Sequence, residues 1–269
     1  MTGKRESAVS GMFYHEDKDT LTKQLEEMFS KAREGSNRMV VSPHAGYAYS
    51  GKTAAHAISS LRKTKEFIVL GPNHTGRGKE FSIMSSGSWN TPLGDVTIDR
   101  EIAEKIKKLD FVEEYDLAHS QEHSIEVQLP FLQHRFKRFK FVPVCIMNIG
   151  YSDDFIYKCQ ALGKTIASIL HKKDVGVIAS SDFSHYLPQN VADMKDEAAV
   201  EKIMNLDITE FFRKLEEVDA SVCGFGPIAV VMSAAKELGL KAKLIHKSSS
   251  GDETGERDAV VAYYAIGFG

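Results

Sequence analysis

The stretch that decides the fold is VGVIASSDFSH at residues 175–185, in which a short apolar run is followed at once by polar residues. Two other stretches have the same form, RMVVSPHAGY at residues 38–47 and FIVLGPNH at residues 67–74. Apolar runs of this length, rich in Val and Ile, are typical of strands buried on both faces of a parallel sheet. Polar side chains therefore follow the ends of three predicted strands.

Strand-like runs alternate with longer segments of helical periodicity along the chain. This alternation predicts an α/β fold in which a central, mostly parallel sheet is flanked by helices. The predicted strands span residues 38–41, 66–70, 140–146, 175–179, 243–246 and 259–266. The predicted helices span residues 20–32, 52–61, 100–109, 124–135, 154–171, 193–204, 208–216 and 227–238. Residues 81–98 predict an irregular excursion or a β-hairpin, and Ser124 and Gly239 are expected at helix ends.

The chain is predicted to form a single domain over residues 1–269. It contains no internal repeat, no low-complexity tract and no Gly/Ser-rich or Pro-rich linker. A chain of 269 residues is within the range that one α/β domain occupies. One domain is therefore the simplest interpretation.

Charge and hydropathy argue against several classes of partner. The formal net charge is −3, and acidic and basic residues are interspersed, so we expect neither a nucleic-acid nor a membrane partner. The basic stretch HRFKRFK at residues 134–140 is interpreted as a solvated helix end, because cations suit helix C-termini. The polar N-terminus and the lack of a membrane-length apolar stretch predict a cytoplasmic protein.

The three cysteines form no short-spaced pair, so the sequence does not predict a disulfide framework. Cys145 lies in an apolar run and Cys159 in a helical pattern, which favours packing roles for both. Cys223 lies just before a predicted apolar helix whose first position is Pro227. A thiol at a helix N-terminus has a lowered pKa, which would suit a reactive or metal-binding cysteine. The alternative is a small buried residue.

The polar residues that follow the predicted strands are expected to meet. The carboxyl ends of strands in an open parallel sheet share one edge, where ligands bind. His44, His74, Asp182 and His185 would then converge there. Each histidine alone is adequately explained as a hydrogen-bonded loop residue, but together they fit either a metal site or acid/base chemistry.

A further group of ligand-type residues is EHSIE at residues 122–126. His123 precedes the predicted helix cap. Glu126 falls in the predicted first turn, where it either complements the helix dipole or belongs to the site. His119 and Glu122 are expected on the surface.

The chain resembles the Memo family, which is related in fold to the class III extradiol dioxygenases. The segments that carry the resemblance occur in the family's order and extend over nearly the whole chain. They are SGMFY at residues 10–14, PHAGY at 43–47, GPNH at 71–74, EHSIE at 122–126, SSDFSH at 180–185 and CGFGP at 223–227.

The resemblance implies a metal pocket with His44, His74 and Cys223 in the ligand positions. It also implies that His185 and Asp182 act beside the metal as catalytic groups. The residues implied to line the pocket for substrate are Tyr47, His123 and Glu126. In the ring-cleaving dioxygenases the third ligand is a carboxylate. A thiolate is a softer ligand, so copper(I) and zinc are candidate metals in addition to iron, which is the first candidate.

Three functions follow as hypotheses. The first is an iron-dependent, redox-active protein with a dioxygenase-like pocket for a small molecule. The second is a zinc-dependent hydrolase built on the same ligands. The third is a non-catalytic signalling module that binds a peptide in the same pocket, with Tyr47, Trp89 and His123 near it.

Overall fold

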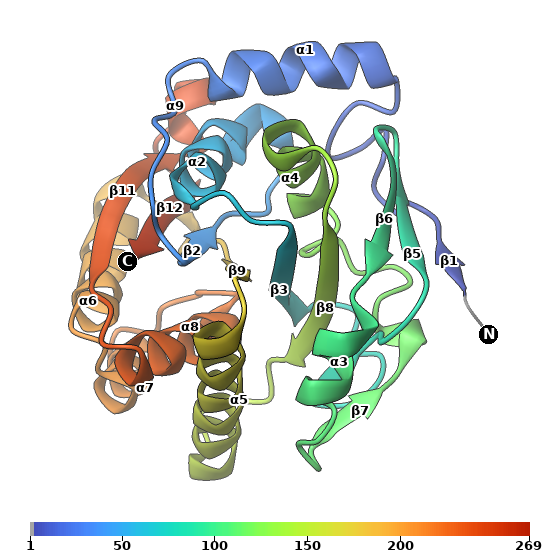
Figure 1. Cartoon of the computed structure of the whole chain (residues 1–269). Helices are drawn as coiled ribbons and strands as arrows, with labels where there is room; N and C mark the ends of the chain where they lie inside the picture. The colour runs from blue at the N-terminus through green and yellow to red at the C-terminus, as the bar shows by residue number, and fades with distance from the viewer. Residues whose placement is uncertain (1–2) are drawn as a thin grey trace.

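The computed structural model describes residues 3–269, which form one α/β domain with a twelve-stranded mixed sheet between two layers of helices (Figure 1). No helix within residues 3–269 is long and apolar enough to cross a membrane. The predicted fold class is confirmed.

The middle of the sheet consists of four parallel strands. In spatial order these are β8 (Lys140–Met147), β3 (Glu66–Asn73), β9 (Gly176–Ser180) and β2 (Met39–Ser42). Nearly every residue of these strands is buried, because helices cover both faces. This explains why their sequences are continuous apolar runs rather than alternating patterns.

The remaining strands extend the sheet on both sides. On the far side of β2, β12 (Val260–Phe268) runs antiparallel and is flanked by β10 (His185–Leu187) and β11 (Ala242–Ser249). Beyond β8, the sheet is completed by β6 (Gly94–Ile98), β5 (Ser88–Thr91), β1 (Lys4–Arg5), β4 (Phe81–Ile83) and β7 (Val112–Glu114).

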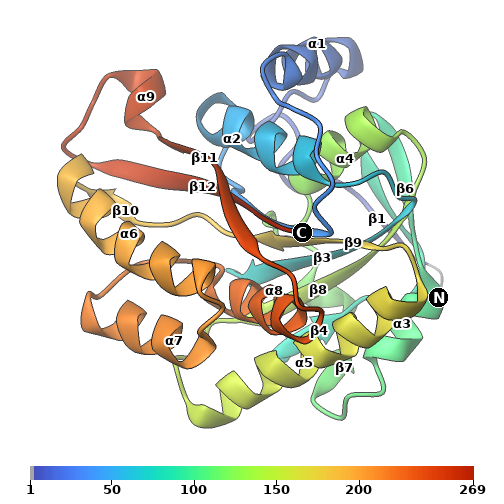
Figure 2. The same ribbon diagram turned by 60° about the vertical axis from the view of Figure 1, so that its left-hand side comes forward.

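The helices divide the hydrophobic core into two parts, one on each face of the sheet (Figures 1 and 2). One face is covered by α1 (Lys18–Phe29), α2 (Tyr47–Ser60) and α4 (Gln128–Phe136). The other is covered by α3 (Arg100–Ile106), α5 (Asp153–Lys172), α6 (Gln189–Met204), α7 (Ile208–Glu217) and α8 (Phe225–Glu237). Two short helical turns, η1 (Asp116–Ala118) and α9 (Gly251–Thr254), lie in connections.

Local signals explain where several helices begin and end. The side chain of Ser152 accepts a hydrogen bond from the Phe155 amide at the start of α5, whose first turn carries acidic residues that suit the helix dipole. After α8, Gly239 has a φ of +65°, a conformation that glycine adopts without steric cost. Gly239 therefore ends this run as the sequence predicts.

One helix start differs from the prediction. Ser124 does not cap α4, which begins at Gln128; its hydroxyl instead donates a hydrogen bond to the Pro72 carbonyl oxygen at 2.9 Å. Residues 124–127 form turns before the helix. The long-range contact to β3 outweighs the local capping signal.

Candidate metal centre

The carboxyl ends of β2, β3 and β9 open into a cavity of about 550 Å³, called here the site cavity. His44 and His74 lie just beyond β2 and β3, and Asp182 lies just beyond β9. His185 begins β10. All four line the cavity together with His123. The sequence-based prediction that strand-end residues converge is therefore confirmed.

The tautomer of His44 follows from its hydrogen bonds. Its Nδ1 lies 2.9 Å from the Ser180 hydroxyl oxygen, and that hydroxyl donates its own proton to the Ser124 carbonyl oxygen at 2.6 Å. Gln128 Nε2 also donates to the Ser180 oxygen. Ser180 must therefore accept from a protonated His44 Nδ1, which leaves Nε2 as an acceptor facing the Cys223 sulfur at 3.2 Å. Burial, and then the neighbouring histidines, lower the pKa of His44 well below its ordinary value.

His74 is oriented by a fully buried carboxylate. Its Nδ1 donates to Glu122 Oε1 at 2.9 Å, and its backbone amide donates to Glu122 Oε2 at 2.6 Å. Burial opposes the ionisation of Glu122, but the hydrogen bond and charge of His74 help to lower the pKa of Glu122 to about 2. The lone pair of His74 Nε2 is free, as in metal-bound histidines that donate their other ring nitrogen to a carboxylate.

Cys223 is held against the end of β9 just before α8. Its neighbour Gly224 packs so closely that an added Cβ would lie 2.3 Å from the Ser180 carbonyl oxygen. The Cys223 sulfur lies 3.2 Å from His44 Nε2 and accepts a hydrogen bond from the Asp182 amide. Burial, and then the charge of Asp182, raise the pKa of the Cys223 thiol well above its ordinary value. The prediction of a lowered Cys223 pKa is therefore wrong. Helix α8 begins only at Phe225, and the effect of burial on the thiol exceeds that of the helix N-terminus.

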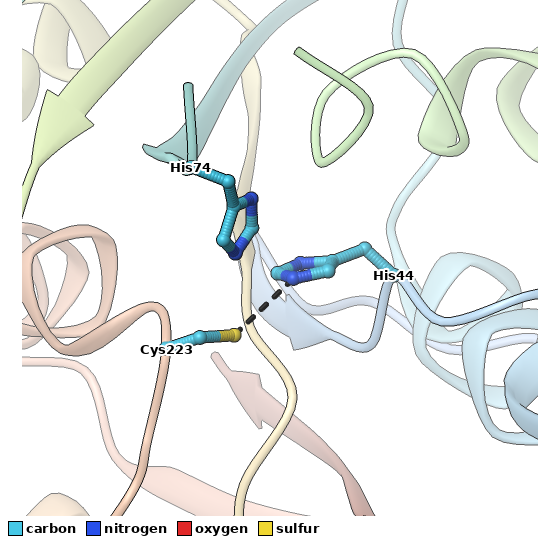
Figure 3. A group of neighbouring side chains, drawn as sticks. All are labelled: His44, His74 and Cys223. Atoms are coloured by element: carbon cyan, nitrogen blue, oxygen red, sulfur yellow. Dashed lines mark hydrogen bonds between the residues drawn. The ribbon is translucent and has the colours of Figure 1, made fainter. Parts of the chain in front are cut away.

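His44, His74 and Cys223 form one group, called here the donor triad (Figure 3). One ligand-type atom of each lies within 4.8 Å of the others. Two unprotonated imidazole nitrogens and one sulfur, facing each other at this spacing, fit a transition-metal ion. A bound metal would favour the thiolate form of Cys223 over the thiol. A second group, His74, Glu122 and His123, meets the same distance criterion and shares His74 with the donor triad.

Asp182 and His185 lie beside the donor triad rather than within it. Asp182 Oδ1 accepts the His44 amide at 2.8 Å, and burial raises the pKa of Asp182 to about 6. The backbone amide of His185 donates to the Ser221 hydroxyl, and its Nδ1 lies 2.9 Å from the Ser221 carbonyl oxygen. A carbonyl oxygen only accepts, so Nδ1 carries the proton and Nε2 is an acceptor.

Two of the residues expected to line the cavity for substrate lie elsewhere. His123 does line it, but Tyr47 and Glu126 are not part of its lining. The Tyr47 hydroxyl donates to the Val127 carbonyl oxygen at 2.6 Å within the core. Trp89, expected near the pocket, is fully buried beneath the guanidinium of Arg5.

Glu126 instead holds the N-terminal segment. Its carboxylate lies 2.7 Å from Arg5 Nη1 and accepts hydrogen bonds from the Ala8 and Val9 amides and the Tyr14 hydroxyl. It precedes α4, so it does not occupy a helical first turn. The sequence offered two roles for Glu126, a residue that complements the helix dipole or a residue of the site. The structure gives it neither role, because its contacts are with the N-terminal segment.

The sequence interpretation missed three residues of the site region. Glu122, expected on the surface together with His119, is fully buried, as is His119. Tyr263 and Glu256, from β12 and the loop before it, line the cavity. No local pattern marks Glu122, whose burial depends on His74 and on Arg5, which donates to the Glu122 carbonyl oxygen. Tyr263 is hidden in an apolar strand pattern.

Fold and donor triad together define a class: an α/β protein in which two histidines at strand ends and one cysteine before a helix form a group that could hold a metal ion. The family model described as Memo-like protein matches residues 5–267, and the chain belongs to this family.

Relatives at about 40% identity agree with this assignment, and a solved structure shares the fold. The chain is 43% identical over 268 residues to a MEMO1 family protein of Methanosarcina barkeri, with 97% of this chain and 98% of that protein covered. It is 42% identical over 286 residues to a MEMO1 family protein of Sulfolobus acidocaldarius, with coverage of 97% and 98%. The crystal structure of an uncharacterised Escherichia coli K12 protein superimposes with a TM-score of 0.58 at 8% identity, covering 87% of this chain and all of that chain. This last likeness concerns the fold alone.

Proposed function

We propose that this chain is an iron-binding, redox-active protein that handles a small molecule in the site cavity, with His44, His74 and Cys223 as the metal ligands. The observation that carries the proposal is the state of the two ligand imidazoles. Each has Nδ1 bound to a buried partner, Ser180 or Glu122, so that Nε2 is unprotonated and belongs to the donor triad. Histidine ligands are commonly prepared for metal in this way.

Iron in such a site would supply open coordination positions for substrate and oxygen, as in dioxygenase-type centres. The protein supplies the surroundings. His185 Nε2 is an acceptor beside the triad and would take a proton from a substrate hydroxyl. Asp182 holds the His44 backbone, and its raised pKa of about 6 would let it accept or return a proton near neutral pH.

The direct test is elemental analysis of protein purified without oxygen and without chelators, repeated on His44→Ala. We expect about one metal ion per chain in the wild type and almost none in the variant, because the buried ligand is lost. His185→Ala is the matched variant: it should keep its metal while losing substrate affinity or turnover. Metal loss in His185→Ala equal to that in His44→Ala would contradict this division of roles.

Zinc is the second candidate, because two imidazoles and a thiolate also form the protein part of catalytic zinc sites that leave a fourth position for water. The protein would then act as a hydrolase. The same elemental analysis distinguishes the two: zinc that remains under anaerobic purification, with no iron, would favour the hydrolase.

A further inference from the structure

The charged residues around the site cavity are of one sign. No lysine or arginine belongs to the cavity lining among residues 3–269, whereas Asp182 and Glu256 do. Pockets for anionic ligands usually contain a cationic side chain that pairs with the ligand. Apart from the donor triad, this cavity offers an anion no such partner.

The rim carboxylate of Glu256 is not engaged by the basic residues nearest in the chain. Glu256 is exposed and forms no ion pair with any residue that the structure describes. Arg257 pairs with Asp252 at 2.8 Å, and Lys52 pairs with Glu253 at 2.7 Å. Glu256 thus remains available to a cation from solution.

Aromatic rings line the same cavity. Tyr49 and Tyr186, which both belong to the lining, are 46% and 77% exposed. Tyr186 has a φ of +56°, and in this bulged strand both it and His185 line the cavity instead of pointing to opposite sides. Exposed rings near a carboxylate are the surroundings in which protein sites recognise ammonium groups.

Polar groups also line the inner part of the cavity. The side chain of Tyr263 is buried and belongs to the cavity lining, as does His185. Asp182, Tyr49 and Tyr186 line the same cavity as Tyr263. A ligand hydroxyl can accept from Tyr263 and donate to His185 Nε2.

We propose that the site cavity takes a small aromatic ligand that carries both a ring hydroxyl and a protonated amine. The amine lies at the rim with Glu256 and the rings of Tyr49 and Tyr186, and the hydroxyl points inward to Tyr263 and His185. A volume of about 550 Å³ suits a ligand of this size. This inference rests on the proposed function, since it assigns the ligand of the same cavity.

The test compares two probes that share a skeleton and end in groups of opposite charge. Tyramine and phloretic acid share a para-hydroxyphenylethyl skeleton, but the first ends in an ammonium and the second in a carboxylate. Binding of each to the full chain is measured by calorimetry at neutral pH with a chelator present, so that the result does not depend on metal. We expect tyramine to bind about tenfold more tightly, the order expected for one exposed ion pair with one cation–π contact.

Variants locate the effect. Glu256→Gln should reduce the preference for tyramine about threefold, whereas Glu253→Gln, a matched change in α9 at a carboxylate already paired with Lys52, should leave it unchanged. Equal or tighter binding of phloretic acid, no binding of either probe, or an unchanged preference in Glu256→Gln would overturn the inference. Because these measurements are made without metal, they stand apart from the elemental analysis that tests the proposed function.

Discussion

The molecule contains two histidine–cysteine contacts that are nearly identical in distance and very different in surroundings. The sulfur of Cys223 lies 3.2 Å from His44 Nε2, and the sulfur of Cys145 lies 3.3 Å from His119 Nδ1. Both histidines are buried, with 2% and 0% of their surface exposed. Chemistry and distance alone therefore do not distinguish a metal-type centre from a packed pair.

The difference lies in what surrounds each pair. His44 and Cys223 have a third donor in His74, and His44 borders the site cavity. Cys145 is fully buried in β8, and His119 packs edge-on against Trp89 at 5.7 Å between ring centroids. The pair belongs to no three-residue donor group within residues 3–269. A third donor and access to a cavity are what make the first pair a candidate centre.

The largest expected effect is the loss of metal when the first pair is broken. Cys223→Ser should weaken metal binding by more than about 100-fold, because the change removes a ligand rather than a residue that supports one. Cys145→Ser makes the same atomic change in the second pair and should retain metal. Metal titration of both variants, with circular dichroism to verify folding, measures the contrast. Equal affinities would mean that Cys223 is only a packing residue.

A smaller effect is expected when the support of His74 is altered. Glu122→Gln should weaken metal binding about 10-fold to 100-fold, because an amide cannot accept all the donors that converge on this carboxylate. Long-range proton–nitrogen NMR correlations of the His74 ring should also show a mixture of tautomers in the metal-free variant.

Glu126→Gln provides the control for Glu122→Gln, since it changes a second buried carboxylate four residues away. It leaves Arg5 without its charged partner and should lower the free energy of unfolding by about 3–5 kcal/mol. Metal affinity of the folded protein should stay the same. A large loss of metal affinity in this variant would show that the two carboxylates act as one unit.

The smallest effect concerns acid stability at the second pair. Burial lowers the pKa of His119 to about 3 from an ordinary value of 6.5. Between these values the unfolded chain binds one more proton than the folded chain, so the free energy of unfolding falls as the pH is lowered through this window. His119→Gln should remove up to about 1.4 kcal/mol per pH unit of this slope. Urea unfolding between pH 6.5 and pH 4 measures it.

Cys145→Ser serves as the control for that slope, because it leaves His119 in its buried position. The slope should then match that of the wild type even if the variant is less stable at every pH. An unchanged slope in His119→Gln would show that this histidine does not titrate differently in the two states.

The strands of the sheet could be predicted because burial on both faces is visible in the local sequence. The six predicted strands are all present with ends shifted by a few residues, and residues 81–98 contain the antiparallel β5–β6 hairpin. Short strands such as β1, β7 and β10 were missed. With only two or three residues each, they carry no periodicity and depend on neighbouring strands for their hydrogen bonds.

The candidate site was predictable to the extent that it lies at strand ends. His44, His74, Asp182 and His185 follow apolar runs, and topology brings such positions together. Glu122 and Glu126 could not be assigned in this way. Both occur in a polar segment that resembles a surface loop, and their roles depend on partners far away in the chain, His74 for one and Arg5 for the other.

The position of β12 in the sheet has a consequence for the order in which the protein forms during synthesis. Strand β2, from residues 39–42, pairs with β9 and β12, so its two edges are satisfied only after residues 176–180 and 260–268 have been made. The carboxylate that binds Arg5 likewise appears 121 positions later in the chain. The donor triad, completed by Cys223, therefore assembles after most of the polypeptide has left the ribosome. Until then His44 and His74 belong to a chain whose long-range strand pairings are incomplete, the situation in which folding is slow and apolar segments stay exposed.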